Sequence, residues 1–130
     1  MRLLFVVQRY GEDVAGGAEQ HCREFAERLV VRGHDVDVLT TCASSYVDWA
    51  NVYPPGISSL HDVTVHRVPT TIARDTGRFN QLNMRLVAAV RARPLEVQRE
   101  WMRMQGPQAD GIPVWLRQHT HDYDCVIFIT

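Results

Sequence analysis

Residues 1–41 read MRLLFVVQRYGEDVAGGAEQHCREFAERLVVRGHDVDVLTT, and their order of apolar and polar positions indicates the fold class. Residues 3–7 are uniformly apolar, which is typical of a strand buried on both faces in a parallel sheet. A loop containing glycines follows, and the next residues predict a helix from about Gly17 to Arg32. Residues 35–41 predict a second strand. This succession predicts a right-handed parallel crossover.

The predicted helix is amphipathic. On its polar face we expect two i,i+4 pairs in the favourable order, Glu19 with Arg23 and Glu24 with Arg28. Gly33 is placed to end the helix in a left-handed conformation. The other face is apolar and carries Ala18, Cys22, Phe25, Ala26, Leu29 and Val30.

Two more buried strands are expected farther along the chain, at residues 63–68 and 124–130. Residues 43–62 show no helical period and are interpreted as an aromatic, proline-bearing excursion. With the first two strands and the predicted helices, this pattern predicts an α/β domain with a doubly wound, mainly parallel sheet.

Helical spacing returns at Phe79 and is interrupted at Pro94. A second helical piece is expected over residues 95–105, and Asp110 is expected to cap a short helix. The apolar side of the first of these helices carries Leu82, Leu86, Val87 and Val90, and that of the last carries Ile112, Trp115 and Leu116.

Composition favours a single globular domain. The chain has 130 residues, of which 45% are hydrophobic, and a formal net charge of −1. General nucleic-acid-binding proteins are far more basic, so no nucleic-acid partner is expected. All 14 basic residues are arginine. A phosphate-binding P-loop and Schiff-base chemistry are excluded, since both need a lysine.

The cysteines and the two ends of the chain bear on its location and extent. Cys22, Cys42 and Cys125 are far apart, which argues against a disulfide framework and fits a reducing compartment. The apolar run at the start is too short for a signal peptide or a membrane span, so a cytoplasmic protein is expected. The chain stops at the tip of a predicted strand, where a ligand-binding loop should begin. We therefore expect it to be the first part of a longer protein.

Gly16 and Gly17, at the start of the first helix, are the main candidate binding residues. Glycines let a ligand approach the backbone, and the first N–H groups of a helix favour an anion such as phosphate. A tight turn that packs the helix on the sheet explains the same residues without a ligand. The dinucleotide fingerprint G-x-G-x-x-G is absent, and Asp37 lies early in its strand. A nicotinamide or flavin cofactor is therefore not expected.

These residues resemble the opening of family 4 glycosyltransferases, which have the GT-B architecture. The similarity rests on the first strand, on the run GGAEQH at residues 16–21, and on RGHDV at residues 32–36, entering the second strand. Residues 42–68 are similar to a bacterial branch of the family, and residues 101–107 and 123–130 also fit.

The resemblance implies a two-domain enzyme that moves a sugar from a nucleotide-sugar donor to an acceptor, with retention of configuration, in glycan or glycolipid synthesis. Residues 1–130 would form its N-terminal, Rossmann-like domain on the acceptor side. The donor-binding C-terminal domain, with its paired-glutamate motif, would be absent. Gly16 and Gly17 match the loop that approaches the donor diphosphate, and Tyr10 matches a tyrosine that contacts the acceptor. No metal or other cofactor is implied, no catalytic residue is assigned, and the chain alone is expected to be inactive.

Three further residues are candidates for acceptor contacts: Glu19 and His21 in the first turns of the helix, and Trp49 in the excursion. Each also has a purely structural explanation. Glu19 can stabilise the helix dipole, His21 can be an ordinary exposed residue, and Trp49 can pin a long loop to the core. Residues 119–124 include metal-ligand types, but they precede a strand on the side away from the ligand edge, so a solvated turn is preferred to zinc.

Residues 78–103 contain six arginines and two acids. Such a basic amphipathic stretch suits peripheral contact with an anionic membrane surface that carries a lipid-linked acceptor. A solvated face whose arginines pair with acids elsewhere is the alternative. For the whole chain, the alternative to an enzyme domain is a stand-alone, non-catalytic nucleotide- or sugar-binding α/β module.

Overall fold

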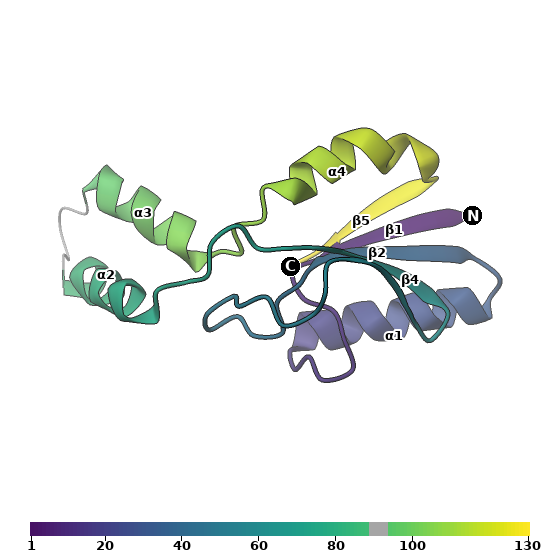
Figure 1. The fold of residues 1–130 in the computed structure, drawn as a ribbon, viewed down its shortest axis with the longest axis horizontal. Helices are drawn as coiled ribbons and strands as arrows, with labels where there is room; N and C mark the ends of the chain where they lie inside the picture. Colours follow the sequence, from purple (N-terminus) through teal and green to yellow (C-terminus); the bar gives the residue numbers. More distant parts are fainter. Residues whose placement is uncertain (89–93) are drawn as a thin grey trace.

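A computed structural model describes residues 1–88 and 94–130 of the chain (Figure 1). Its strands are β1 (Arg2–Val7), β2 (Asp35–Thr41), β3 (Gly56–Leu60), β4 (Val63–Val68) and β5 (Cys125–Ile129). Its helices are α1 (Gly17–Val31), α2 (Thr76–Ala88), α3 (Leu95–Gln105) and α4 (Gly111–His119), followed by a 3-10 turn, η1 (Thr120–Asp122).

Within these residues, the strands form one sheet in the order β3-β4-β2-β1-β5. β1 pairs in parallel with β2 and β5, and β2 pairs in parallel with β4. β3 lies at the edge and runs antiparallel to β4. α1 covers one face of the sheet and α4 covers the other (Figure 1). The predicted α/β class with a mainly parallel sheet is confirmed.

The central strand β1 contributes to two cores because successive side chains of a strand point to opposite faces. Phe5 lies on the α1 side, in one cluster with the buried side chains of Cys22 and Ala26. Leu4 lies on the other side, where Trp115 of α4 packs against the cluster. The positions of Cys22 and Trp115 agree with the helical faces predicted from the sequence.

Five details of the sequence prediction need correction. The strand expected to be buried at residues 124–130 forms as β5, but its residues are exposed or half-buried because β5 lies at an edge of the sheet. β3 was not predicted, because an exposed edge strand reading Gly-Ile-Ser-Ser-Leu lacks apolar alternation. Phe25 was predicted to face the core but is exposed, and its ring lies 4.6 Å from that of His21. Val87 is also exposed, and Asp110 makes no capping hydrogen bond from its side chain. Val90 lies outside the described residues.

The hairpin formed by α2 and α3 stands away from the sheet, beyond the carboxyl ends of the parallel strands (Figure 1). The segments that lead to it and from it, residues 69–75 and 106–110, bind each other. The Thr71 N–H donates to the Gln108 carbonyl at 2.7 Å. Among the described helices, none is both long and apolar enough to cross a membrane.

Asp37 ties three elements together on the α4 side of the sheet. Its buried carboxylate accepts hydrogen bonds from the Tyr123 hydroxyl at 2.5 Å and from His66 Nε2 at 3.1 Å. Arg2 Nη2 lies 3.6 Å away. Burial acts to raise the pKa of Asp37, but the two hydrogen bonds and the charges of His66 and Arg2 outweigh it and hold the pKa below its usual value. The carboxylate is therefore favoured in the folded chain.

We expect Tyr123→Phe to lower the free energy of unfolding by about 1–2 kcal/mol, because the buried carboxylate loses a donor. A lowered folded pKa means that the contribution of Asp37 is fully present above about pH 4 and is lost as the pH falls through the folded pKa. Urea unfolding across this acid range should show a steeper loss of stability in the wild type than in Tyr123→Phe. Tyr46→Phe, which removes an exposed hydroxyl, is the control. Identical acid profiles for the wild type and Tyr123→Phe would contradict the prediction.

Candidate functional site

The candidate site lies at the edge of the sheet where the parallel strands end. Three connections meet there: the glycine loop (residues 8–16) after β1, the loop at residues 42–55 after β2, and the segment at residues 69–75 after β4. α1 begins at the same edge (Figure 1). Ligands of open parallel sheets bind at this edge, so the structure places the predicted glycines where a ligand is expected.

Gly16 and Gly17 shape the N-terminus of α1. Gly16 has a φ of 150°, and a Cβ there would lie 2.1 Å from Glu19 Oε2 and 3.1 Å from Arg9 Nη2. At Gly17, no atom lies within 4 Å of such a Cβ. The first N–H groups of a helix have no partner within the helix, and here no side chain of the preceding residue caps them. They are therefore open to an anion from the side of Gly17.

Arg9 and Glu19 form a buried ion pair beside Gly16. Arg9 Nη2 lies 2.6 Å from Glu19 Oε1, and Arg9 Nε donates to the same oxygen at 3.0 Å. The guanidinium also donates to the carbonyls of Ala15 and Ser44, both at 3.2 Å. The Tyr46 ring lies over it, with the ring centre 5.0 Å from Arg9 Cζ. This pair fastens the end of β1 to the first turn of α1 and to the loop after β2.

The expected pairing of Glu19 with Arg23 is wrong, because Arg9 takes the Glu19 carboxylate. The expected pair of Glu24 with Arg28 is confirmed, at 3.8 Å. Glu19 still lies in the first turn of α1, where a carboxylate interacts favourably with the helix dipole. Its predicted contact with an acceptor stays a prediction.

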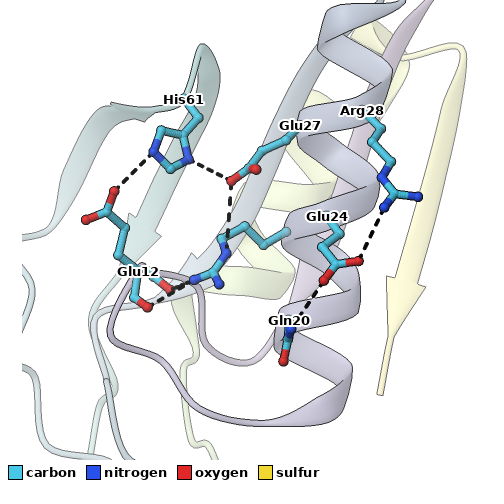
Figure 2. Close-up of polar contacts among 8 residues, drawn as sticks. Glu12, Gln20, Glu24, Glu27, Arg28 and His61 are labelled. Atoms are coloured by element: carbon cyan, nitrogen blue, oxygen red, sulfur yellow. Dashed lines mark hydrogen bonds and ion pairs between the residues drawn. The ribbon is translucent and has the colours of Figure 1, made fainter.

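Arg23 and His61 brace the middle of the glycine loop, and Figure 2 shows His61 between Glu12 and Glu27. Arg23 Nη1 donates to the carbonyls of Gly11 at 2.8 Å and Glu12 at 3.0 Å. His61, in the turn between β3 and β4, contacts Glu27 through Nδ1 at 2.7 Å and Glu12 through Nε2 at 3.1 Å. The hydrogen bond and the charge of Glu27 raise the pKa of His61. The loop is thus held to α1 and to the β3–β4 turn.

Tyr10 and His21 lie in very different surroundings. Tyr10 is buried in the core on the α1 side, and its hydroxyl has no hydrogen-bond partner among the described residues. Burial raises the pKa of Tyr10 far above its usual value. His21 is exposed on α1, and its ring is tilted by 44° against the ring of Phe25. The acceptor contacts expected of Tyr10 and His21 stay predictions.

Trp49 is buried and forms part of the wall of a cavity of about 300 Å³. The cavity lies between the loop at residues 42–55, the start of α2 and the end of α3. Trp49 Nε1 donates to the Gln105 carbonyl at 2.7 Å. A Cβ on Gly106 would lie 2.6 Å from the same nitrogen, so the indole needs a glycine there. Trp49 therefore pins its loop and also borders a space for a ligand.

Two arginines that the sequence analysis did not single out take part in the site. Arg9 could have been found from the sequence, since it lies two residues after a buried strand and shortly before the glycines. Arg74 could not, because its partners are the carbonyls of Val47, Met104 and Gln105, remote in sequence. Over residues 1–88 and 94–130, no three His, Cys, Asp or Glu side chains gather in a way that could hold a metal ion.

The candidate site thus has an open helix N-terminus and a buried ion pair, and a cavity lies at Trp49, in the loop that contacts Arg9. Comparison of the chain with protein-family models, curated proteins and solved structures finds no match. Its chemistry is therefore inferred from the groups themselves. Backbone N–H groups at a helix start bind anions, and a cavity bordered by an indole accepts a ring.

We expect Gly16→Ala to lower the free energy of unfolding by about 2 kcal/mol or more, because the new methyl group would meet the Glu19 carboxylate and disturb its pair with Arg9. Gly33→Ala is the matched control. Gly33 also has a positive φ, 84°, but no atom lies within 4 Å of its added Cβ. Backbone strain alone should cost about 1 kcal/mol there. Equal losses in the two variants, measured by denaturant unfolding, would contradict the constraint at Gly16.

We expect the ring of His61 to titrate with a midpoint above the usual value of about 6.5. Its contribution to stability is then present below that pH and is lost as the pH rises through the folded pKa. NMR titration should show that Glu27→Gln lowers the midpoint. Glu24→Gln changes the same residue type one turn away, where the carboxylate contacts Gln20 and Arg28 (Figure 2), and should leave it unchanged. An unaltered midpoint in Glu27→Gln would refute this bracing contact.

Proposed function

We propose that the chain is the N-terminal, acceptor-side domain of a retaining glycosyltransferase of the GT-B type, which transfers a sugar from a nucleotide-sugar donor to an acceptor. The observation that carries the proposal is the open N-terminus of α1 at the carboxyl edge of a parallel sheet, where Gly16 and Gly17 leave the first N–H groups accessible. A Rossmann-like domain is consistent with the observed strand order and with helices on both faces.

In this proposal the N-terminus of α1 stabilises the leaving diphosphate. Breaking the glycosidic bond to the donor places negative charge on the diphosphate while the sugar becomes oxocarbenium-like, and preorganised N–H dipoles lower the energy of that state. Arg9 does not supply a free cation there, because Glu19 neutralises it. The nucleotide is then held by a second domain, and closure of the two domains excludes water from the reactive donor. No metal ion is needed for this step.

The acceptor would approach from the side of the α2–α3 hairpin. This hairpin projects beyond the sheet edge (Figure 1) and presents exposed apolar side chains, including Met84 and Met102. Its arginines would favour an anionic membrane surface and hence a lipid-linked acceptor. Among them, Arg78 pairs with Glu100, as the solvated-face alternative expects, whereas Arg91 and Arg93 lie outside the described residues.

NMR titration of the chain with a nucleoside diphosphate tests the central contact. We expect shifts of the Gly16, Gly17 and Ala18 amide signals. Gly17→Asp should weaken binding about tenfold or more, because it places a carboxylate at the anion position. The variant should still fold, since the space around Gly17 is open.

Gly77→Asp makes the same change in the first turn of α2 and serves as the control. It should bind the nucleoside diphosphate as the wild type does. Amide signals of Gly16 and Gly17 that do not move at millimolar nucleotide would overturn the proposed donor contact.

The coding sequence beyond codon 130 tests the enzyme assignment separately. We expect it to encode a second α/β domain with a paired-glutamate motif. A stop codon in its place would contradict the glycosyltransferase proposal. In that case, nucleotide binding by the chain alone would instead favour a non-catalytic binding module.

A further inference from the structure

The cavity beside Trp49 has the size and walls of a site for one ring. At about 300 Å³, it lies at the small end of the range for small-molecule sites. Its apolar wall includes Ile72, Ala73 and Met104 as well as the indole. Because Trp49 is only 3% exposed, its indole closes the back of the cavity, and a sugar ring would pack on the apolar wall as a whole while polar groups at the rim bind its substituents.

The position of the Trp49 ring is fixed before any ligand arrives. Its indole N–H is bonded to Gln105, and its own carbonyl accepts a hydrogen bond from the Thr70 hydroxyl at 2.8 Å. The backbone of Trp49 has a φ of 56°, which is unusual for a bulky residue. Because both the side chain and the backbone of Trp49 are held by hydrogen bonds, this residue loses little conformational freedom when a ligand binds.

The cavity carries more positive than negative charge. Arg78 is neutralised by an ion pair with Glu100, and the Asp75 carboxylate accepts a hydrogen bond from the Arg78 N–H. Arg74 and Arg103, by contrast, make no ion pair within the described part of the chain. The lining therefore has three guanidinium groups against two carboxylates.

Arg74 is held in place by backbone carbonyls and makes no ion pair within the described residues, although the charge of Asp48 acts to raise its pKa. Its guanidinium donates to three backbone carbonyls, those of Val47, Met104 and Gln105, and lies 4.4 Å from the centre of the Phe79 ring. Burial lowers its pKa, but an arginine stays protonated under ordinary conditions. A fixed charge beside apolar walls is weakly screened, so it attracts an anion more strongly than a solvated arginine does.

We propose that this cavity binds the sugar ring of an acceptor that carries a carboxylate or a phosphate group. The ring lies against the apolar wall that Trp49 closes, and the anionic group is bound by Arg103 at the rim and attracted by Arg74. This inference rests on the proposed function, because it identifies the cavity as the acceptor side of the same enzyme. It adds the charge class of the acceptor, which neither the glycines nor the overall fold indicates.

The cavity and the N-terminus of α1 are joined by one stretch of chain. The loop at residues 42–55 contacts Arg9 through the Ser44 carbonyl and the Tyr46 ring, and it places Trp49 at the cavity. A donor diphosphate at Gly16 and Gly17 and an acceptor beside Trp49 would therefore both lie next to this loop.

The test is an NMR titration of the chain with glucuronate, glucose 6-phosphate, glucose and inorganic phosphate, followed at the Trp49 indole signal. We expect at least one of the two anionic sugars to bind about tenfold more tightly than glucose or phosphate, as one charge-assisted contact provides. The better of the two shows whether the acceptor group is a carboxylate or a phosphate. A Trp49 signal that responds equally to glucose, or that phosphate alone reproduces, would overturn the proposal.

Arg103→Gln and Arg99→Gln make the same change on α3, but only Arg103 lines the cavity. We expect Arg103→Gln to reduce the preference for the anionic sugar to within about threefold of glucose, and Arg99→Gln to retain it. A preference that survives in Arg103→Gln would exclude the assigned contact. Shifts at Gly16 and Gly17 with a nucleoside diphosphate are read in separate samples, so failure at the cavity leaves the donor contact standing.

Discussion

The buried pair of Arg9 and Glu19 is the contact on which the candidate site depends. A buried ion pair is stable only when its geometry is good and its remaining donors are satisfied. Arg9 meets both conditions through two bonds to one Glu19 oxygen and further bonds to the carbonyls of Ala15 and Ser44. Gly16 must lack a side chain so that the pair can close across it. The ion pair of Arg9 and Glu19 therefore sets the conformation of the glycine loop. The pair can form in this way only because Gly16 has no side chain.

This pair also limits what the site can do by itself. Because Glu19 cancels the charge of Arg9, an incoming diphosphate meets oriented N–H groups but no free cation at the start of α1. The helix N-terminus provides a partial positive charge equivalent to about half an elementary charge. A dianionic leaving group needs more compensation than this. Under the proposed function, the further positive charge must come from the donor-binding part of the enzyme.

Local pattern was enough to predict the fold class and most of its elements, whereas the contacts of the site required tertiary information. The run of apolar residues predicts the strand at Val63–Val68, and the conformational freedom of glycine predicts the left-handed Gly33 after the helix. Both are observed. The prediction that Glu19 pairs with Arg23 is wrong because Arg9, ten residues earlier, binds the same carboxylate. Helical spacing gives no information about a partner that lies outside the helix. Sequence order likewise gave no sign that Arg74 would reach the end of α3, thirty residues away.

The loop at residues 42–55 links the two candidate ligand regions. Its ends are closed on each other, since the N–H groups of Val52 and Tyr53 both donate to the Cys42 carbonyl. Asn51 and Thr70 then exchange hydrogen bonds, which fix the loop to the segment after β4. With so many of its backbone groups satisfied, the loop has few alternative conformations at comparable energy. A displacement of the loop near Arg9 is therefore expected either to move Trp49 as well or to be opposed by the hydrogen bonds that hold the loop. The distance between the two regions is in this way a property of the fold and does not have to be established anew when ligands bind.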